Sequence, residues 1–191
     1  MPNFGPKTTK NLQEAFAGES AARNRYTYFA SVARKAGFIQ IANIFEETAD
    51  NEKEHAKLWA KALEVIGDTA ANLQSAISGE NYENQTMYPK MAEEAEEEGH
   101  SDIAESFRKV GEAEKAHEAR YRQLLINVEN DKVFKKDQVV RWKCNNCGYI
   151  HEGLEAPTEC PSCHHPKPIL RCLLKPIKLD NCLFYVSGQH D

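Results

Sequence analysis

Two copies of one short pattern, Glu-x-x-His, offer the ligands of a metal site. The first places Glu52 three residues before His55, and the second places Glu114 three residues before His117. Residues three apart lie on one face of an α-helix, so each carboxylate and its imidazole can bind the same metal ion. Two such pairs, joined by one Glu from each of two further helices, form a site for two metal ions inside a four-helix bundle. The chain must therefore supply two more Glu residues and four helices.

The helices and the missing Glu residues are both visible as an internal repeat. Apolar residues at helical spacing predict helices over about 8–37, 38–66, 72–98 and 101–130. The last two segments repeat the first two: Glu19 matches Glu80 at an offset of 61 residues, whereas the two Glu-x-x-His copies lie 62 residues apart. One residue was therefore inserted between these matches. Because the repeat copies a Glu together with its Glu-x-x-His, Glu19 and Glu80 are expected to complete the site.

One further carboxylate, Glu83, breaks the repeat, because the matching position in the first helix is Ala22. It lies one helical turn beyond Glu80. A dry bundle core does not tolerate so many carboxylates without cations, since an unpaired buried charge costs several kcal/mol. Without metal, several of these carboxylates are expected to hold protons.

Beyond about residue 131 the helical pattern stops, and two Cys-x-x-Cys pairs follow. Cys144 pairs with Cys147, Cys160 pairs with Cys163, and twelve residues separate the two pairs. Four thiolates at this spacing bind one tetrahedral metal ion, either iron or zinc. The first 143 residues contain no cysteine, which favours metal binding in a reducing compartment over a disulfide framework.

Charge and hydropathy exclude several function classes. The net charge of -5 argues against non-specific nucleic-acid binding, which needs a basic surface. No run of 18 apolar residues predicts a membrane helix, and residues 1–5 lack the pattern of a secretory signal. The expected location is the cytoplasm, with neither nucleic acid nor membrane as a partner.

From about Lys10 to Lys167 the chain resembles the rubrerythrin family. The resemblance is carried by the repeat, the four cysteines, the segment 17–26, the run Gly79-Glu80-x-x-Glu83, and Met87-Tyr88-Pro89. It implies a mainly α fold, with a ferritin-like four-helix bundle over 8–130 followed by a small β-rich rubredoxin-like metal domain over 138–175. Residues 176–191 form a tail without an assigned role. Cys172 and Cys182 also have no assigned role.

The resemblance also implies three non-haem iron ions per chain, two in a carboxylate-bridged site and one in a tetrathiolate site. The implied metal ligands are Glu19, Glu52, His55, Glu80, Glu83, Glu114, His117, Cys144, Cys147, Cys160 and Cys163. Glu52 and Glu114 would bridge the two irons. The implied catalytic residues are Glu83, His55, Tyr26 and Tyr88. Glu83 would hold one iron when oxidised, that iron would move toward His55 when reduced, and the tyrosines would donate hydrogen bonds beside the carboxylates.

The implied activity is that of a di-iron peroxidase acting in oxidative-stress defence. It reduces hydrogen peroxide to water with electrons from an NAD(P)H-linked reductase or a rubredoxin, relayed through the thiolate-bound iron. One alternative is a ferritin-like protein that oxidises and sequesters iron. Another is a zinc knuckle that only contacts partners.

The connection between the second and third predicted helices is short for a crossed bundle. If those helices run parallel, the chain must travel on the order of 40 Å between them. The eight steps from Val65 to Leu73 span at most roughly 28 Å. Either the bundle is up-down-up-down, or the chain exchanges its helical halves with a second copy. We favour the exchanged homodimer because it keeps the family's site geometry.

Overall fold

The computed structural model describes residues 4–173, which form five α-helices, two shorter helical turns and three β-strands. The expected fold class, a mainly α chain with a small β-rich metal domain after it, is confirmed. The described residues divide at residue 68 into two compact units. The predicted tail, 176–191 with Cys182, lies outside the described residues. Within the described part of the chain, no helix combines the length and the apolar character that crossing a membrane requires.

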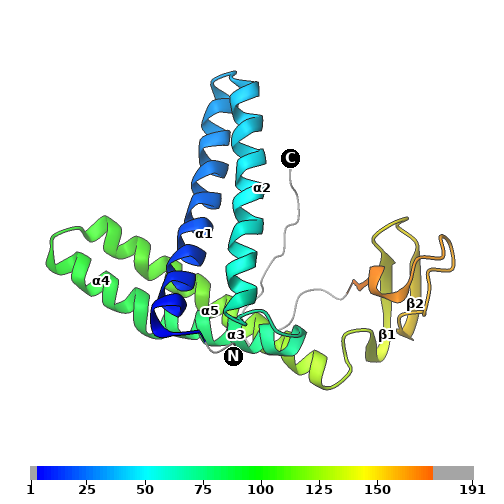
Figure 1. Cartoon of the computed structure of the whole chain (residues 1–191). Coiled ribbons are helices and arrows are strands. Elements are labelled where there is room, and N and C mark those ends of the chain that lie inside the picture. The colour runs from blue at the N-terminus through cyan, green and yellow to red at the C-terminus, as the bar shows by residue number, and fades with distance from the viewer. Residues whose placement is uncertain (1–3, 174–191) are drawn as a thin grey trace. The chain divides into compact units, whose positions relative to one another are not determined.

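The first unit is a hairpin of two long helices. Helices α1 (Pro6–Lys35) and α2 (Ile39–Ala62) lie side by side (Figure 1). Gly37 adopts a φ of 83° at the turn, in the left-handed region that glycine enters without steric cost. The buried residues of the two helices are all alanines: Ala22, Ala30, Ala33, Ala42, Ala49, Ala56 and Ala60. Such small side chains let the two backbones approach closely.

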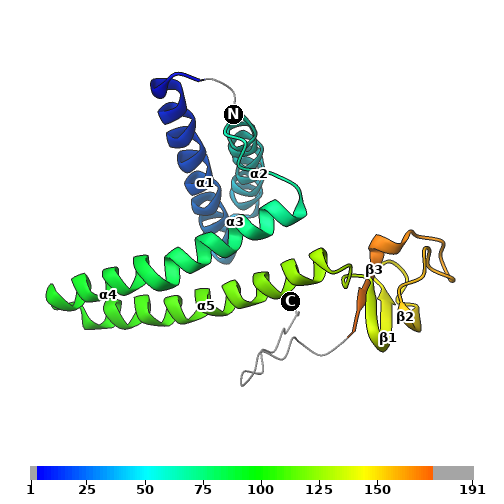
Figure 2. The same ribbon diagram turned by 90° about the horizontal axis from the view of Figure 1, so that it is seen from below.

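The second unit begins with a similar hairpin. Helices α3 (Thr69–Tyr82) and α4 (Tyr88–Glu97) are joined by a five-residue π-helical turn, η1 (Glu83–Met87), and α5 (Ser101–Glu129) runs beside them (Figure 2). Gly99, with a φ of 82°, repeats the role of Gly37 at the turn. The third predicted helix is therefore interrupted by a π turn, which the periodicity of apolar residues did not indicate.

The π turn absorbs the inserted residue of the repeat. Before it, Glu19 matches Glu80 at an offset of 61, and after it Tyr26 matches Tyr88 at 62. Tyr26 packs against Phe45 with ring centres 6.1 Å apart, and Tyr88 packs against its counterpart on α5, Phe107, at the same distance. Buried alanines beyond the turn match likewise: Ala30 with Ala92 and Ala33 with Ala95. One extra residue in a regular α-helix would rotate all later side chains by about 100°. The wider turn prevents this rotation.

The β-rich part consists of three antiparallel strands in the order β2-β1-β3. They are β1 (Lys135–Cys144), β2 (Ile150–Glu155) and β3 (Leu170–Cys172). The core centres on Trp142, which is fully buried and donates a hydrogen bond from Nε1 to the backbone oxygen of Gly153 at 3.1 Å. Cys144 and Cys160 lie in the same core, so this core contains one member of each cysteine pair.

Candidate metal centres

The first hairpin brings three predicted ligands together. Glu19 of α1 and the pair Glu52 and His55 of α2 form the first cluster, with ligand atoms within 4.8 Å of one another. Nδ1 of His55 lies 2.8 Å from Oε2 of Glu52, as the spacing of three residues predicts. A hydrogen bond with Glu52 and, next, burial raise the pKa of Glu19 above its ordinary value, because two adjacent carboxylates repel each other unless one holds a proton.

The second hairpin forms an equivalent arrangement. Glu80 of α3 with Glu114 and His117 of α5 form the second cluster, again with ligand atoms within 4.8 Å of one another. Nδ1 of His117 lies 2.6 Å from Oε2 of Glu114 and 3.5 Å from Oε2 of Glu80. Burial, followed by proton sharing with Glu114, raises the pKa of Glu80. Each helical hairpin thus supplies two carboxylates and one imidazole.

Both clusters fit a metal cation. Oε2 of Glu80 is buried without a hydrogen-bond donor, which is a costly state for a carboxylate oxygen. The carboxylates of Glu52, Glu80 and Glu114 are only 15 to 18% exposed, so water screens them little. A cation bound between the carboxylates would replace the proton that now relieves their repulsion. Carboxylate and imidazole ligands suit iron.

Glu83 is the first residue of the π turn and lies near the second cluster. Its charge contributes to raising the pKa of both Glu80 and Tyr88, which places its carboxylate within electrostatic reach of them. It is not among the three residues whose ligand atoms gather within 4.8 Å. Its role as a ligand of oxidised iron therefore stays a prediction.

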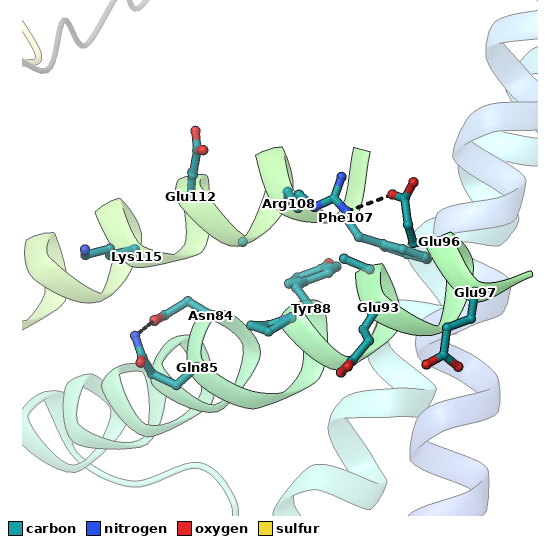
Figure 3. Close-up of a pocket in the computed structure, with 13 residues that line it drawn as sticks. Asn84, Gln85, Tyr88, Glu93, Glu96, Glu97, Phe107, Arg108, Glu112 and Lys115 are labelled. Carbon is teal, nitrogen blue, oxygen red and sulfur yellow. Dashed lines mark hydrogen bonds and ion pairs between the residues drawn. The ribbon is translucent and has the colours of Figure 1, made fainter. Parts of the chain in front are cut away.

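Tyr88, one of the two candidate tyrosines, interacts electrostatically with the carboxylates of the second cluster. Burial and then the charges of Glu114, Glu83 and Glu80 raise its pKa, so the phenol stays protonated at neutral pH. Tyr88 also lines a groove of about 830 Å³ between α4 and α5, beside Phe107 (Figure 3). Tyr26 lies in the first hairpin and makes ring contacts with two phenylalanines. A hydrogen-bonding role for either hydroxyl remains a prediction.

All four cysteines of the paired motifs meet in one thiol cluster. Sγ of Cys144 lies 3.7 Å from Sγ of Cys163, and Sγ of Cys147 lies 3.6 Å from Sγ of Cys160. A tetrahedral ion with metal–sulfur bonds of about 2.3 Å separates its sulfurs by about 3.8 Å, so the spacing fits. Burial raises the pKa of the Cys160 thiol to about 11. Without a metal ion this thiol is protonated, and a bound cation would displace the proton.

Two family models match separate segments of the chain, one in the helices and one around the cysteines. The family model described as Rubrerythrin matches residues 10–125, and the one described as Rubrerythrin, rubredoxin-like domain matches residues 142–168. The chain belongs to the rubrerythrin family. A rubrerythrin of Clostridium perfringens is 50% identical over 85% of this chain and 92% of its own length. A rubrerythrin of Nitratidesulfovibrio vulgaris is 47% identical over the same shares of the two chains.

The rubrerythrin assignment agrees with where the clusters lie. Both carboxylate–histidine clusters fall within the segment matched to the rubrerythrin helices, and all four cysteines fall within the segment matched to the rubredoxin-like domain. The carboxylates and histidines are thus the candidate ligands of the di-iron site, and the thiol cluster is the candidate site of the rubredoxin-like iron. The family consists of oxidoreductases, consistent with a peroxidase of oxidative-stress defence.

Proposed function

We propose that this rubrerythrin-family protein reduces hydrogen peroxide to water with electrons that originate on NAD(P)H. The observation that carries the proposal is the pairing, in one chain, of two carboxylate–histidine clusters with a four-thiol cluster. Reduction of one peroxide consumes two electrons and two protons and yields two waters. Iron bound at the carboxylates would supply electrons and Lewis acidity. Iron held by four thiolates changes oxidation state with little rearrangement, which suits a one-electron relay.

The protein's own residues provide support and orientation. Glu52 and Glu114 each present a carboxylate from a rigid helix beside its paired imidazole, so the ligand atoms are positioned before metal binds. The protonated hydroxyl of Tyr88 can donate a hydrogen bond toward the neighbouring carboxylates. The electron donor would be an NAD(P)H-linked reductase or a rubredoxin. Four thiols that must stay reduced favour a cytoplasmic location.

Peroxide should reoxidise the reduced protein roughly tenfold or more faster than oxygen does. The protein is reduced chemically under oxygen-free conditions. It is then mixed in a stopped-flow instrument with peroxide or with oxygen at the same concentration. The competing function, iron oxidation and sequestration, requires the opposite order because oxygen is then the oxidant. A faster reaction with oxygen would overturn the peroxidase proposal.

The visible spectrum tests which metal the thiol cluster holds. A ferric tetrathiolate site is red, whereas a protein with zinc in this site is colourless. Zinc would leave the relay without a redox centre.

Replacing Glu83 by alanine should slow turnover with peroxide by on the order of ten- to a hundredfold while two irons remain bound. The expectation follows from Glu83 being the one candidate ligand without a counterpart in the first hairpin, where Ala22 stands. Iron is counted on purified protein, and turnover is measured by the loss of peroxide. The matched control is Glu97→Ala, which removes an exposed carboxylate from the same hairpin. Peroxide kinetics equal to the wild type would refute the role.

We further propose that the protein is a homodimer whose two copies exchange helical halves. Helix α2 ends at Ala62 and α3 begins at Thr69, so seven Cα–Cα steps connect them. Glu52 lies about 15 Å before that end and Glu80 about 17 Å after that start. Parallel helices with both carboxylates at one depth would need a connection of about 32 Å, whereas seven steps reach roughly 25 Å. Pairing each hairpin with the partner chain's other hairpin removes this conflict.

A further inference from the structure

A buried carboxylate that the proposed chemistry does not use lies next to the second cluster. Glu118 follows His117 on α5 and is 8% exposed. Its Oε2 accepts a hydrogen bond from Nδ2 of Asn84 at 2.8 Å, and both of its oxygens lie 3.2 Å from Nδ2 of Asn81. Its Oε1 accepts from Nε and Nη2 of Arg122 at 2.8 and 2.5 Å. The group is therefore fully satisfied, as a buried charge must be.

The hydrogen bonds from Asn81 and Asn84 to Glu118 connect three elements at the π turn. Asn81 lies in the last turn of α3, Asn84 lies in η1, and Glu118 lies on α5. Nδ2 of the Asn84 side chain also donates a hydrogen bond to the backbone oxygen of Glu80 at 2.7 Å. In a regular α-helix that oxygen would accept the backbone N–H of the same residue, Asn84. The side chain of Asn84 thus bonds a carbonyl at the entrance of the π turn and anchors the turn to the facing helix.

The first hairpin serves as an internal control because it has no inserted residue. The positions that match the four network residues are Ser20, Arg23, Ala56 and Ala60. There is no carboxylate among them, and all four line an open groove of about 570 Å³ between α1 and α2. Polar side chains fill the matching place in the second hairpin. Among the described residues, this network and the π turn therefore occur together, in the hairpin that carries Glu83.

A π turn needs such an anchor because the extra residue can be accommodated at more than one place along a helix. If the wide turn moved toward the C-terminus, residues 83–87 would become regular α-helix. The direction of Glu83 relative to Glu80 would then change. Single π turns are rare and occur mostly at functional sites, where contacts with neighbouring elements stabilise them. Here the contacts that could fix the position of the turn are those of Glu118 with the two asparagines.

We propose that Glu118 is a positioning residue that holds the π turn at Glu83–Met87 and thereby keeps Glu83 beside the second cluster. Asn81 and Asn84 are the donors through which it acts, and Arg122 balances its charge on the solvent side. The inference rests on the metal site of the proposed function, but it does not depend on peroxide being the substrate.

Glu118→Gln should raise amide hydrogen exchange in residues 83–88 by on the order of tenfold in the metal-free, full-length protein. The side chains of Asn81 and Asn84 need an acceptor at this position. A glutamine amide has one acceptor oxygen in place of two and carries an NH₂ group that cannot accept, so the contact with Asn84 is weakened. Binding of Co²⁺, added alone and followed by its visible spectrum, should weaken by roughly ten- to a hundredfold. The matched control is Glu96→Gln, which removes an ion pair with Arg108 between α4 and α5 but touches no residue of the π turn.

A second variant separates positioning from general stability. Asn84→Ala should raise exchange in the same segment, and the double variant should raise it by less than the product of the two single effects, because both changes remove the same Asn84–Glu118 hydrogen bond. Exchange in residues 83–88 that matches the wild type, or that rises equally throughout α3 and α5, would overturn the proposal. Effects of the two changes that multiply would overturn it as well. None of these readouts uses peroxide, so the inference and the peroxidase function can fail separately.

Discussion

Co-expression of a Glu52→Ala chain with a Glu114→Ala chain should restore about a quarter of the wild-type peroxidase activity, although each variant alone should be inactive. In an exchanged heterodimer, one bundle combines the altered halves of both chains and the other combines the two intact halves. Random pairing makes about half of the dimers mixed, and half of the sites in each mixed dimer are intact. Activity and iron content per chain are measured on the co-expressed mixture, and again on the mixed dimer isolated with two different affinity tags, for which about half of the wild-type activity is expected.

The control pairs two changes in the same hairpin. A Glu52→Ala chain with a Glu19→Ala chain leaves one defect in each bundle, because both carboxylates belong to the first unit. No activity should return. If the first pair stays as inactive as its parents, each di-iron site is built within a single chain and the exchange is wrong.

Cys160→Ser should abolish NADH-linked turnover, with a loss on the order of a hundredfold or more. Cys160 is buried in the core of the β-rich part, and its thiolate is one of only four that the thiol cluster offers. A serine hydroxyl cannot replace a thiolate ligand, so the relay loses its iron. Oxidation of the chemically reduced di-iron site by peroxide should survive, since its ligands lie in the helices. Turnover is followed at the absorbance of NADH, and direct oxidation is followed by stopped flow.

The matched control for this experiment is Cys172→Ser. Cys172 lies on β3 in the same small sheet but does not belong to the thiol cluster. Its replacement should leave both activities unchanged. If Cys160→Ser loses both activities, the helical and thiolate centres do not function separately. If it keeps NADH-linked turnover, electrons reach the di-iron site by another route.

The sequence alone determined the parts of the sites that are local along the chain. A spacing of three residues on a helix sets the distance between a carboxylate and its imidazole, and the structure has them 2.8 Å apart at His55 and 2.6 Å apart at His117. The Cys-x-x-Cys pairs are equally local. The repeat also showed that Glu19 and Glu80 are equivalent and that one residue is inserted after them. These conclusions depend on residues close together in the sequence or on comparing two segments of it, so no knowledge of packing was needed.

Only the tertiary structure decided how the inserted residue is accommodated. The backbone hydrogen bonds of an α-helix span four residues and those of a π turn span five. The choice depends on keeping Tyr88 packed against Phe107 and on the bonds from Asn84 to the facing helix. Glu118 was missed for the same reason. On the sequence it is one more charged residue on a charged helix, and it becomes a buried acceptor only because the hairpin packs the π turn against it.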